Sequence, residues 1–171
     1  MPRYVAFLRG VSPMNAKMPE LKACFESAAF TNVRTLLSSG NVVFDARSSK
    51  ISSLESRAEK AMESELGRSF GTFVRSVEHL QGLIESQPFA RFKLPASSKE
   101  VITFLRRPAD VELKLPIVRD GASILQIIGS DVLCVYIPGP KGPAFMGLLE
   151  RTFGKVITTR TLQTVRKCCS A

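Results

Sequence analysis

The sequence contains no tryptophan and a single histidine, His79, among its 171 residues. One histidine excludes a His-rich zinc site and an H-E-x-x-H helix, and it leaves little room for a Ser-His-Asp triad. The four cysteines, Cys24, Cys134, Cys168 and Cys169, have no C-x-x-C spacing, so we interpret them as unpaired thiols and expect Cys24 and Cys134 to be buried. No catalytic signature, metal-ligand cluster or cofactor fingerprint occurs, and the sequence therefore predicts no particular reaction, cofactor or metal.

Long apolar runs are also missing. The longest extend over only a few residues, such as Val5 to Leu8, whereas a membrane-spanning helix needs about 20 residues and the apolar region of a signal peptide about 7–15. We therefore expect a cytoplasmic protein without a membrane segment. Apolar residues make up 44% and charged residues 23% of the chain, which is typical of soluble globular proteins.

Basic residues outnumber acidic ones, with 24 Lys and Arg against 15 Asp and Glu and a formal net charge of +9. Residues 1–92 hold 12 basic and 9 acidic side chains, and residues 93–171 hold 12 and 6, so the excess leans toward the C-terminal half. A basic surface concentrates anions such as nucleotides, nucleic acid or acidic proteins without selecting among them. The charge fits a role in solubility equally well, and both interpretations stay open.

The first half of the chain alternates apolar runs with segments of helical period. The pattern predicts strands over residues 4–9, 33–37, 41–45 and 72–76, and helices from residue 18 to before Thr31, over 51–66 and over 77–86. Ser38-Ser39-Gly40 joins the second and third strands as a hairpin, because glycine adopts the positive φ that such a turn needs. The order β-α-β-β-α-β is typical of a ferredoxin-like unit.

The second half repeats this order less clearly. It predicts strands over residues 101–105, 124–128, 132–137 and 155–158, and helices over 109–115, 144–153 and 161–168. A linker rich in Pro and Ser extends over residues 88–99. The sequence thus predicts an α+β fold of two tandem ferredoxin-like units with antiparallel sheets plus a C-terminal helix, divided into residues 1–90 and 91–171.

In a β-α-β-β-α-β unit, the loop after the first strand, the hairpin turn and the loop before the fourth strand meet at one edge of the sheet. Loops on a rigid sheet edge commonly carry binding groups, and arginine can fork onto phosphate or carboxylate while backbone N–H groups add donors. The candidate ligand-binding residues are Arg9, Gly10, Ser39, Gly40, Asn41, Arg75 and Arg160. The alternative is structural, with the arginines paired to acidic residues or to free backbone carbonyls.

Other patterns point less strongly to function. The corresponding edge of the second half would hold Arg106, Arg107, Gly129, Ser130, Asp131, Gly154 and Lys155. The segment from Gly139 to Pro143 precedes a helix and could receive an anion, with a plain connection as the alternative.

Two further groups of side chains in the first half point to structural roles more than to binding. Tyr4, Phe7 and Phe44 form at most a thin platform for stacking RNA bases, since alternation places Tyr4 and Phe7 on opposite faces of a strand. Glu55, Glu59 and Glu63 recur at four-residue spacing among basic residues, which indicates a solvated helix face.

Several stretches resemble one bacterial family. They are Tyr4 to Gly10, Met18 and Leu21, Phe30 to Thr35, Ser39 to Phe44, Val74-Arg75-Ser76, Pro88-Phe89, Val101 to Leu105, Thr159-Arg160 and Thr164-Val165. Across nearly the whole chain the sequence is similar to the family known as domain of unknown function 1697, and the Ser-Gly-Asn turn is the most specific match. The resemblance implies an α+β fold with an internal duplication and no established activity.

The chain departs from that family at two places. Ser12 stands where the family usually has Asn, and Pro13-Met14 replaces a Gly-rich continuation. After Thr159-Arg160 the family usually has Asn-Trp-Asn-Thr, whereas this chain reads Thr-Leu-Gln-Thr over residues 161–164. A ligand that depends on those asparagines would bind differently here or not at all.

We therefore expect a noncatalytic protein that binds an anionic ligand, a nucleotide or a nucleic-acid backbone, at the loop edge near Arg9 and Asn41. The rival hypothesis is an enzyme that acts on a phosphorylated or carboxylated small molecule. An enzyme should have one enclosed pocket with convergent polar groups, whereas a nucleic-acid binder should have an open basic groove. The sequence leaves the oligomeric state open.

Overall fold

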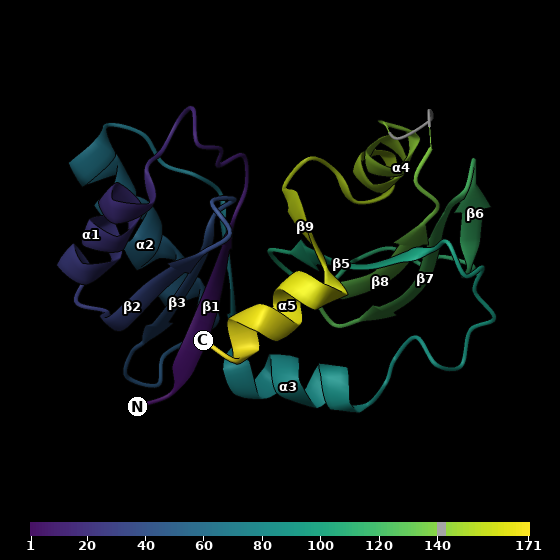
Figure 1. Cartoon of the computed structure of the whole chain (residues 1–171), viewed down its shortest axis with the longest axis horizontal. Coiled ribbons are helices and arrows are strands. Elements are labelled where there is room, and N and C mark those ends of the chain that lie inside the picture. Colours follow the sequence, from purple (N-terminus) through teal and green to yellow (C-terminus); the bar gives the residue numbers. More distant parts are fainter. Residues whose placement is uncertain (140–142) are drawn as a thin grey trace. The chain divides into compact units, whose positions relative to one another are not determined.

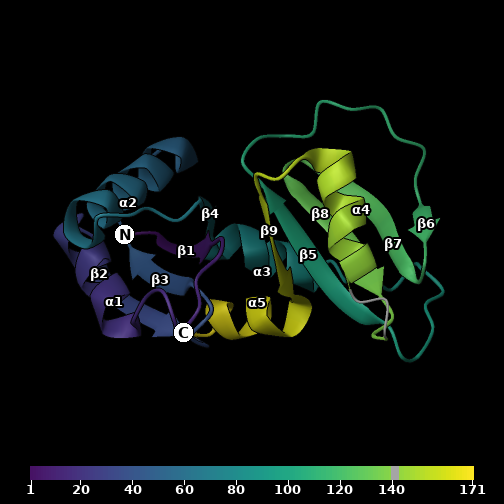
Figure 2. The ribbon, with the colours of Figure 1, turned by 90° about the horizontal axis from the view of Figure 1, so that it is seen from above.

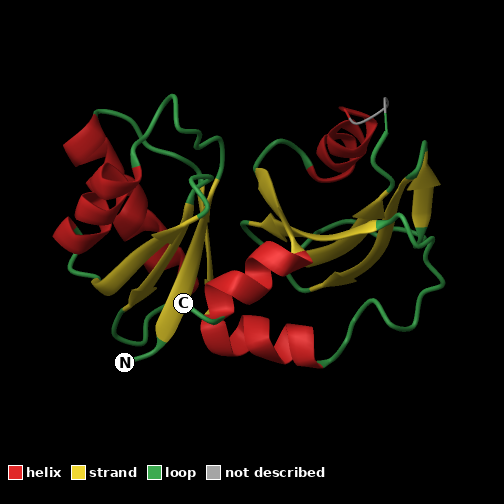
Figure 3. Ribbon diagram, in the orientation of Figure 1, coloured by secondary structure: helices red, strands yellow, loops and turns green. Residues whose placement is uncertain are grey.

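A computed structural model of the chain describes residues 1–139 and 143–171 (Figure 1). The fold is mixed α/β, and the described residues form five helices and two antiparallel sheets (Figure 3). They divide into two compact units, Met1–Glu85 with Arg166–Ala171, and Ser86–Val165. The predicted anion loop at Gly139 to Pro143 falls largely on residues 140–142, outside the described residues. Within the described part of the chain, no helix is long and apolar enough to cross a membrane.

The first unit contains a four-stranded antiparallel sheet. Its strands are β1 (Arg3–Leu8), β2 (Thr31–Leu36), β3 (Asn41–Asp45) and β4 (Thr72–Ser76), in the order β2-β3-β1-β4. Helices α1 (Met18–Ser27) and α2 (Ile51–Leu66) lie together on one face of the sheet, as Figures 1 and 2 show, and α3 (Val77–Glu85) follows β4. Strand β1 is central because it pairs with both β3 and β4.

The core of the first unit uses the alternation of side chains along β1. Tyr4, Ala6 and Leu8 join the hydrophobic core with α1 and α2, and the Tyr4 ring stacks on that of Phe44 with 5.8 Å between ring centroids. Phe7, on the opposite face of the strand, is fully buried as well. These three aromatic rings therefore pack inside the protein and form no exposed platform for nucleic-acid bases.

Carboxylates from α2 cap the outer edge of β4. The Val74 N–H donates to Oε2 of Glu55 at 3.0 Å, and the Thr72 N–H donates to Oε2 of Glu59 at 3.0 Å. Four helical residues rise about 6 Å and two strand residues about 6.6 Å, so carboxylates four residues apart can reach alternate N–H groups of a strand. Glu55 is only 2% exposed, and the prediction of a solvated face is wrong for this glutamate. The two bonds satisfy donors that an edge strand otherwise leaves open.

The second unit contains a five-stranded antiparallel sheet in the order β6-β7-β8-β5-β9. Its strands are β5 (Lys99–Leu105), β6 (Ile117–Arg119), β7 (Ala122–Ile128), β8 (Asp131–Tyr136) and β9 (Ile157–Thr161). Helix α4 (Pro143–Phe153) contributes Phe145, Leu148 and Leu149 to the core of this unit. Helix α5 (Leu162–Cys169) follows β9, and its residues from Arg166 onward belong to the first unit.

Residues 109–115 form an extended loop, so the helix predicted there is wrong. Pro108 and Pro116 flank the stretch, the residue before a proline disfavours helical conformation, and so short a segment cannot offset the cost of helix nucleation. Ala109 and Leu115 pack against the core of the second unit instead. The loop leads into β6, a short strand that the sequence did not predict.

Asp45 at the end of β3 links three segments of the first unit. Asn32 Nδ2 donates to Asp45 Oδ2 at 2.6 Å, and Arg3 Nη1 pairs with Asp45 Oδ1 at 2.8 Å. The hydrogen bond from Asn32 is the main cause of a lowered Asp45 pKa, with Arg3 contributing and partial burial opposing it. The carboxylate is therefore favoured in the folded state.

We expect the free energy of unfolding of Asp45→Asn to fall less on acidification than that of the parent protein. Because the folded-state pKa of Asp45 is lowered, its contribution to the free energy of unfolding is present above the unfolded value of about 3.9 and is lost as the pH falls through the folded value. Urea unfolding at neutral pH and at about pH 3 should show a smaller acid-induced loss for the variant than for the parent. Equal losses in both proteins would contradict this role of Asp45.

Candidate anion-binding site

Backbone hydrogen bonds hold together the predicted loop edge of the first unit. The Leu8 N–H donates to the Gly40 carbonyl at 2.8 Å, and the Arg9 N–H donates to the Gly71 carbonyl at 2.8 Å. The loop after β1, the β2–β3 hairpin and the loop before β4 therefore meet. Five of the predicted site residues lie at this edge: Arg9, Gly10, Ser39, Gly40 and Asn41.

The hairpin turn requires glycine at position 40. Its φ is +83°, a region that residues with a Cβ rarely adopt. A Cβ at this position would lie 2.9 Å from Leu8 Cβ and 3.0 Å from Val11 Cβ. The prediction that Gly40 adopts a turn conformation unfavourable to other residues is confirmed.

Asn41 braces the same turn. Its side chain is fully buried, and Nδ2 donates to the Leu36 carbonyl at 3.2 Å and to Ser39 Oγ at 3.1 Å. The amide donors are therefore directed into the hairpin. This arrangement explains a Ser-Gly-Asn turn by local structure, without a ligand.

The loop after β1 is closed by its own side chains. Asn15 Nδ2 donates to the Gly10 carbonyl at 2.8 Å, and Asn15 Oδ1 accepts from the Ser12 N–H at 2.9 Å. Gly10 has a φ of +83°, yet a Cβ there would meet no atom within 4 Å. Gly10 thus lies at the surface, in contrast to Gly40.

Arg75 and Arg160 lie within strands of different units. Arg75 on β4 is buried, pairs with Val5 of β1 and donates from Nη1 to the Val74 carbonyl at 2.8 Å. Arg160 on β9 donates from Nη1 to Thr158 Oγ1 at 2.7 Å and to the Thr159 carbonyl at 3.0 Å. Each guanidinium group therefore uses at least one of its N–H donors for a hydrogen bond within its own strand.

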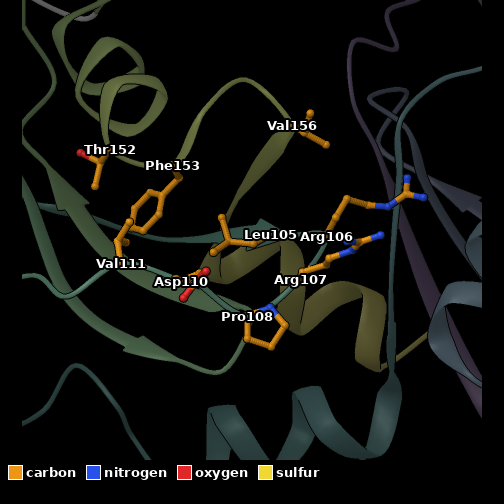
Figure 4. A pocket seen from close by; sticks show the side chains of 10 residues that line it. Leu105, Arg106, Arg107, Pro108, Asp110, Val111, Thr152, Phe153 and Val156 are labelled. Carbon is orange, nitrogen blue, oxygen red and sulfur yellow. The ribbon is translucent and has the colours of Figure 1, made fainter.

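A pocket of about 360 Å³ lies at the end of β5 in the second unit (Figure 4). It coincides with the sheet edge where Arg106 and Arg107 directly follow the strand. Its apolar lining consists of Leu105, Pro108, Ala109, Val111, Phe153 and Val156, and its polar lining of Arg106, Arg107, Asp110 and Thr152. The loop that replaces the predicted helix forms one wall, and the end of α4 contributes to another.

The two arginines give the pocket a cationic side. Figure 4 shows both side chains extending in the same direction, whereas Val111 and Phe153 lie on the other side. Arg107 is exposed and Arg106 is half-buried. A guanidinium group presents a planar fork of N–H donors that matches phosphate or carboxylate oxygens.

Two polar groups complete the lining. Asp110, which lies between the two sides in Figure 4, brings a carboxylate that can accept a hydrogen bond from a hydroxyl or amino group. The Thr152 hydroxyl donates to the Leu148 carbonyl at 2.8 Å, so its oxygen remains an acceptor. A ligand that fits all of these groups is an anion that also carries an apolar ring and a hydrogen-bond donor.

Sequence reasoning grouped Arg106 and Arg107 at this edge but did not identify Asp110, Thr152 or Phe153. Those three residues fall in two separate segments predicted as helices, over 109–115 and 144–153, and nothing in the sequence pattern places them next to one another. The one sequence feature that could have indicated the pocket is Arg-Arg-Pro at the end of a buried strand.

Three of the four cysteines have a raised pKa, which disfavours their thiolate form. Burial raises the pKa of Cys134 to about 12, and burial also raises the pKa of Cys24 and of Cys169. The thiolate is the nucleophilic form of cysteine. Cys24 and Cys134 are buried, as predicted. In the part of the chain that the structure describes, no cluster of three or more His, Cys, Asp or Glu side chains could hold a metal ion.

The chain is similar to a protein family and to a solved bacterial structure. The family model described as "Protein of unknown function (DUF1697)" matches residues 1–129. The structure of a conserved bacterial protein from Streptococcus pneumoniae has a TM-score of 0.68 and 19% sequence identity, covering 99% of this chain and 97% of that chain. No curated protein matches the sequence. At this identity the structural likeness concerns the fold alone.

Proposed function

Since the chain belongs to the DUF1697 family of proteins of unknown function, we propose from its geometry that it is a noncatalytic protein that binds a small anionic ligand, best matched by a nucleotide. The site is the pocket lined by Arg106 and Arg107. The observation that carries the proposal is that two arginines line the same pocket as an apolar wall that includes the Phe153 ring.

The chemistry of a nucleotide matches the lining group by group. Its phosphate would accept hydrogen bonds from the Arg106 and Arg107 forks, which bind phosphate more strongly than neutral donors do. Its base would pack against Phe153 and the aliphatic lining, and a ribose hydroxyl would donate to Asp110. The volume of about 360 Å³ falls at the lower end of the range for small-molecule sites, about 300–1,000 Å³.

The test is a set of binding measurements with nucleoside mono- and triphosphates, by calorimetry and by thermal shift. We expect Arg107→Ala to lower affinity by about 10- to 100-fold, because a hydrogen bond to a charged group contributes about 1.5–3 kcal/mol, and Arg106→Ala/Arg107→Ala to lower it further. Lys93→Ala/Arg119→Ala removes the same charge from exposed positions that do not line the pocket. Equal losses in both double variants, or no binding by the parent, would refute the proposal.

The rival hypothesis of an enzyme rests on Asp110. A reaction on a phosphorylated or carboxylated substrate needs a group that transfers a proton, and Asp110 is the acidic side chain of the lining. Asp110→Asn keeps a hydrogen-bond acceptor and removes the general base. A bound nucleotide that stays unchanged over long incubation with the parent favours binding alone, whereas turnover that disappears in Asp110→Asn favours the enzyme.

We also propose that the two units are tandem ferredoxin-like repeats, divided near residue 90. The order β2-β3-β1-β4 in the first unit matches the order β7-β8-β5-β9 in the second. The Leu8 N–H donates to the Gly40 carbonyl at 2.8 Å, and the Leu105 N–H donates to the Ser130 carbonyl at 2.9 Å. Both bonds join the end of the first strand of a unit to the hairpin that follows.

Two pairs of arginines occupy equivalent places in this proposed duplication. Arg9 and Arg106 each follow the first strand of their unit. Arg75 pairs with Val5 of β1, and Arg160 pairs with Ile102 of β5. Val5 and Ile102 each lie three residues before the end of the first strand of their unit. The loop over residues 106–116 stands where the first unit has α1, which supports a repeat that has lost one helix. On this view the anion site of the second unit corresponds to the predicted edge near Arg9.

A further inference from the structure

Basic side chains make up half of the lining of a second hollow, which lies in the first unit. It has a volume of about 390 Å³ and is lined by Arg34 and Leu36 of β2 and by Arg166, Lys167, Ser170 and Ala171 at the end of α5. Its lining contains three basic side chains and no acidic side chain. We propose that this hollow, the β2–α5 basic pocket, binds the phosphate backbone of single-stranded nucleic acid.

Arg34, Arg166 and Lys167 are exposed, and among residues 1–139 and 143–171 their own charged side chains make no ion pair and no hydrogen bond. Like charges gathered around one hollow repel each other, and an anion between them removes that repulsion. Ser170 Oγ lies in the same lining and donates to the Arg166 carbonyl at 3.2 Å.

The shape of the hollow favours a chain of phosphates over a small molecule. The hollow is more open to solvent than the Arg106–Arg107 pocket and has Leu36 as its larger apolar contact, so it would enclose a small ligand less completely. A polyanion gains affinity from several neutralised phosphates without being enclosed.

An acidic peptide added as a strand to the β2 edge fits less well. The register of β2 against β3 shifts between Thr31 and Arg34, and Asn32 in this bulge has a φ of +48°. A bulge twists an edge strand away from further pairing. Electrostatic attraction to phosphates needs no such backbone register.

A neighbouring hollow places one carboxylate close to this charge. It shares Arg166 and Ser170 with the β2–α5 basic pocket and adds Glu85 at the end of α3. Glu85→Gln would remove a negative charge near Arg166 and should strengthen binding of nucleic acid. Stronger binding by this variant would indicate an electrostatic effect, because a variant that merely lost its fold would bind more weakly.

The experiment is a titration of a fluorescent oligothymidylate, followed by anisotropy, over salt concentrations between about 50 and 200 mM. With three phosphates neutralised, the slope of log K against log salt should be about −2, and Arg166→Ala/Lys167→Ala should reduce its magnitude by about 1.4. Lys22→Ala/Lys60→Ala, at exposed positions of α1 and α2 outside the pocket, is the charge-matched control and should leave the slope unchanged. Thermal melting verifies that each variant is folded.

Several outcomes would overturn this inference. They are no binding by the parent at the lowest salt, equal effects of the two double variants, or weaker binding by a folded Glu85→Gln variant. Competition by oligoglutamate at the same charge concentration would also overturn it, since the site would then accept any polyanion. Arg106→Ala/Arg107→Ala should not change the slope, which keeps this inference separate from the nucleotide proposal.

Discussion

Gly40→Ala is expected to lower the free energy of unfolding by about 2–5 kcal/mol, because it combines left-handed backbone strain of about 1–2 kcal/mol with overpacking of about 1–3 kcal/mol. The φ of +83° accounts for the strain. The new Cβ would meet Leu8 Cβ at 2.9 Å and the Leu8 carbonyl oxygen at 3.1 Å. Leu8 lies on the central strand β1, so relief by movement would disturb the sheet. Urea unfolding with comparison of midpoints and slopes measures the change.

Gly10→Ala is the matched control for this prediction. Gly10 has the same φ of +83°, but a Cβ there meets no atom within 4 Å. Its replacement should therefore cost about 1–2 kcal/mol, from backbone strain alone. The difference between the two variants isolates the contact of position 40 with Leu8 and Val11. If both alanines destabilised the protein equally, the close approach at Gly40 would have no energetic consequence.

Glu55→Ala is expected to lower the free energy of unfolding by about 2–4 kcal/mol, since a buried N–H left without an acceptor costs about 1–3 kcal/mol and packing is lost as well. The donor in question is the Val74 N–H, 3.0 Å from Glu55 Oε2. Glu55→Gln keeps an oxygen acceptor and should retain part of the stability. Chemical unfolding and hydrogen exchange at Val74 measure the global and the local effect.

Glu63→Ala on the same helix is the control for Glu55→Ala. Glu63 is exposed, and a surface substitution of this kind usually changes stability by no more than about 0.5 kcal/mol. Both variants remove one negative charge from α2 and raise helix propensity equally. A Glu55→Ala variant as stable as Glu63→Ala would show that solvent, not Glu55, satisfies the edge of β4.

The predicted and observed elements agree where local patterns decide the structure. Helix α2 covers Ile51–Leu66 and strand β4 covers Thr72–Ser76, as predicted. Both depend on the spacing of apolar residues and on the Gly67 cap, which are features of residues close together in the sequence. The stretch over 109–115 has a weak period between two prolines, and contacts of Ala109 and Leu115 with a distant core decided its conformation. Glu55 illustrates the same limit, since a four-residue spacing cannot tell a solvated carboxylate from one that caps a strand.

The order of strands and helices, the hairpin with Gly40 and the family relationship follow from residues close together in the chain. They rest on periodicity, turn stereochemistry and short motifs, which act over a few residues. The candidate sites depend on residues far apart in sequence. Arg106 meets Phe153 in one pocket, and Arg34 meets Lys167 in another. Only the folded sheets and helices bring such pairs together, because the distance between two remote side chains is a property of packing and carries no signal in the local pattern.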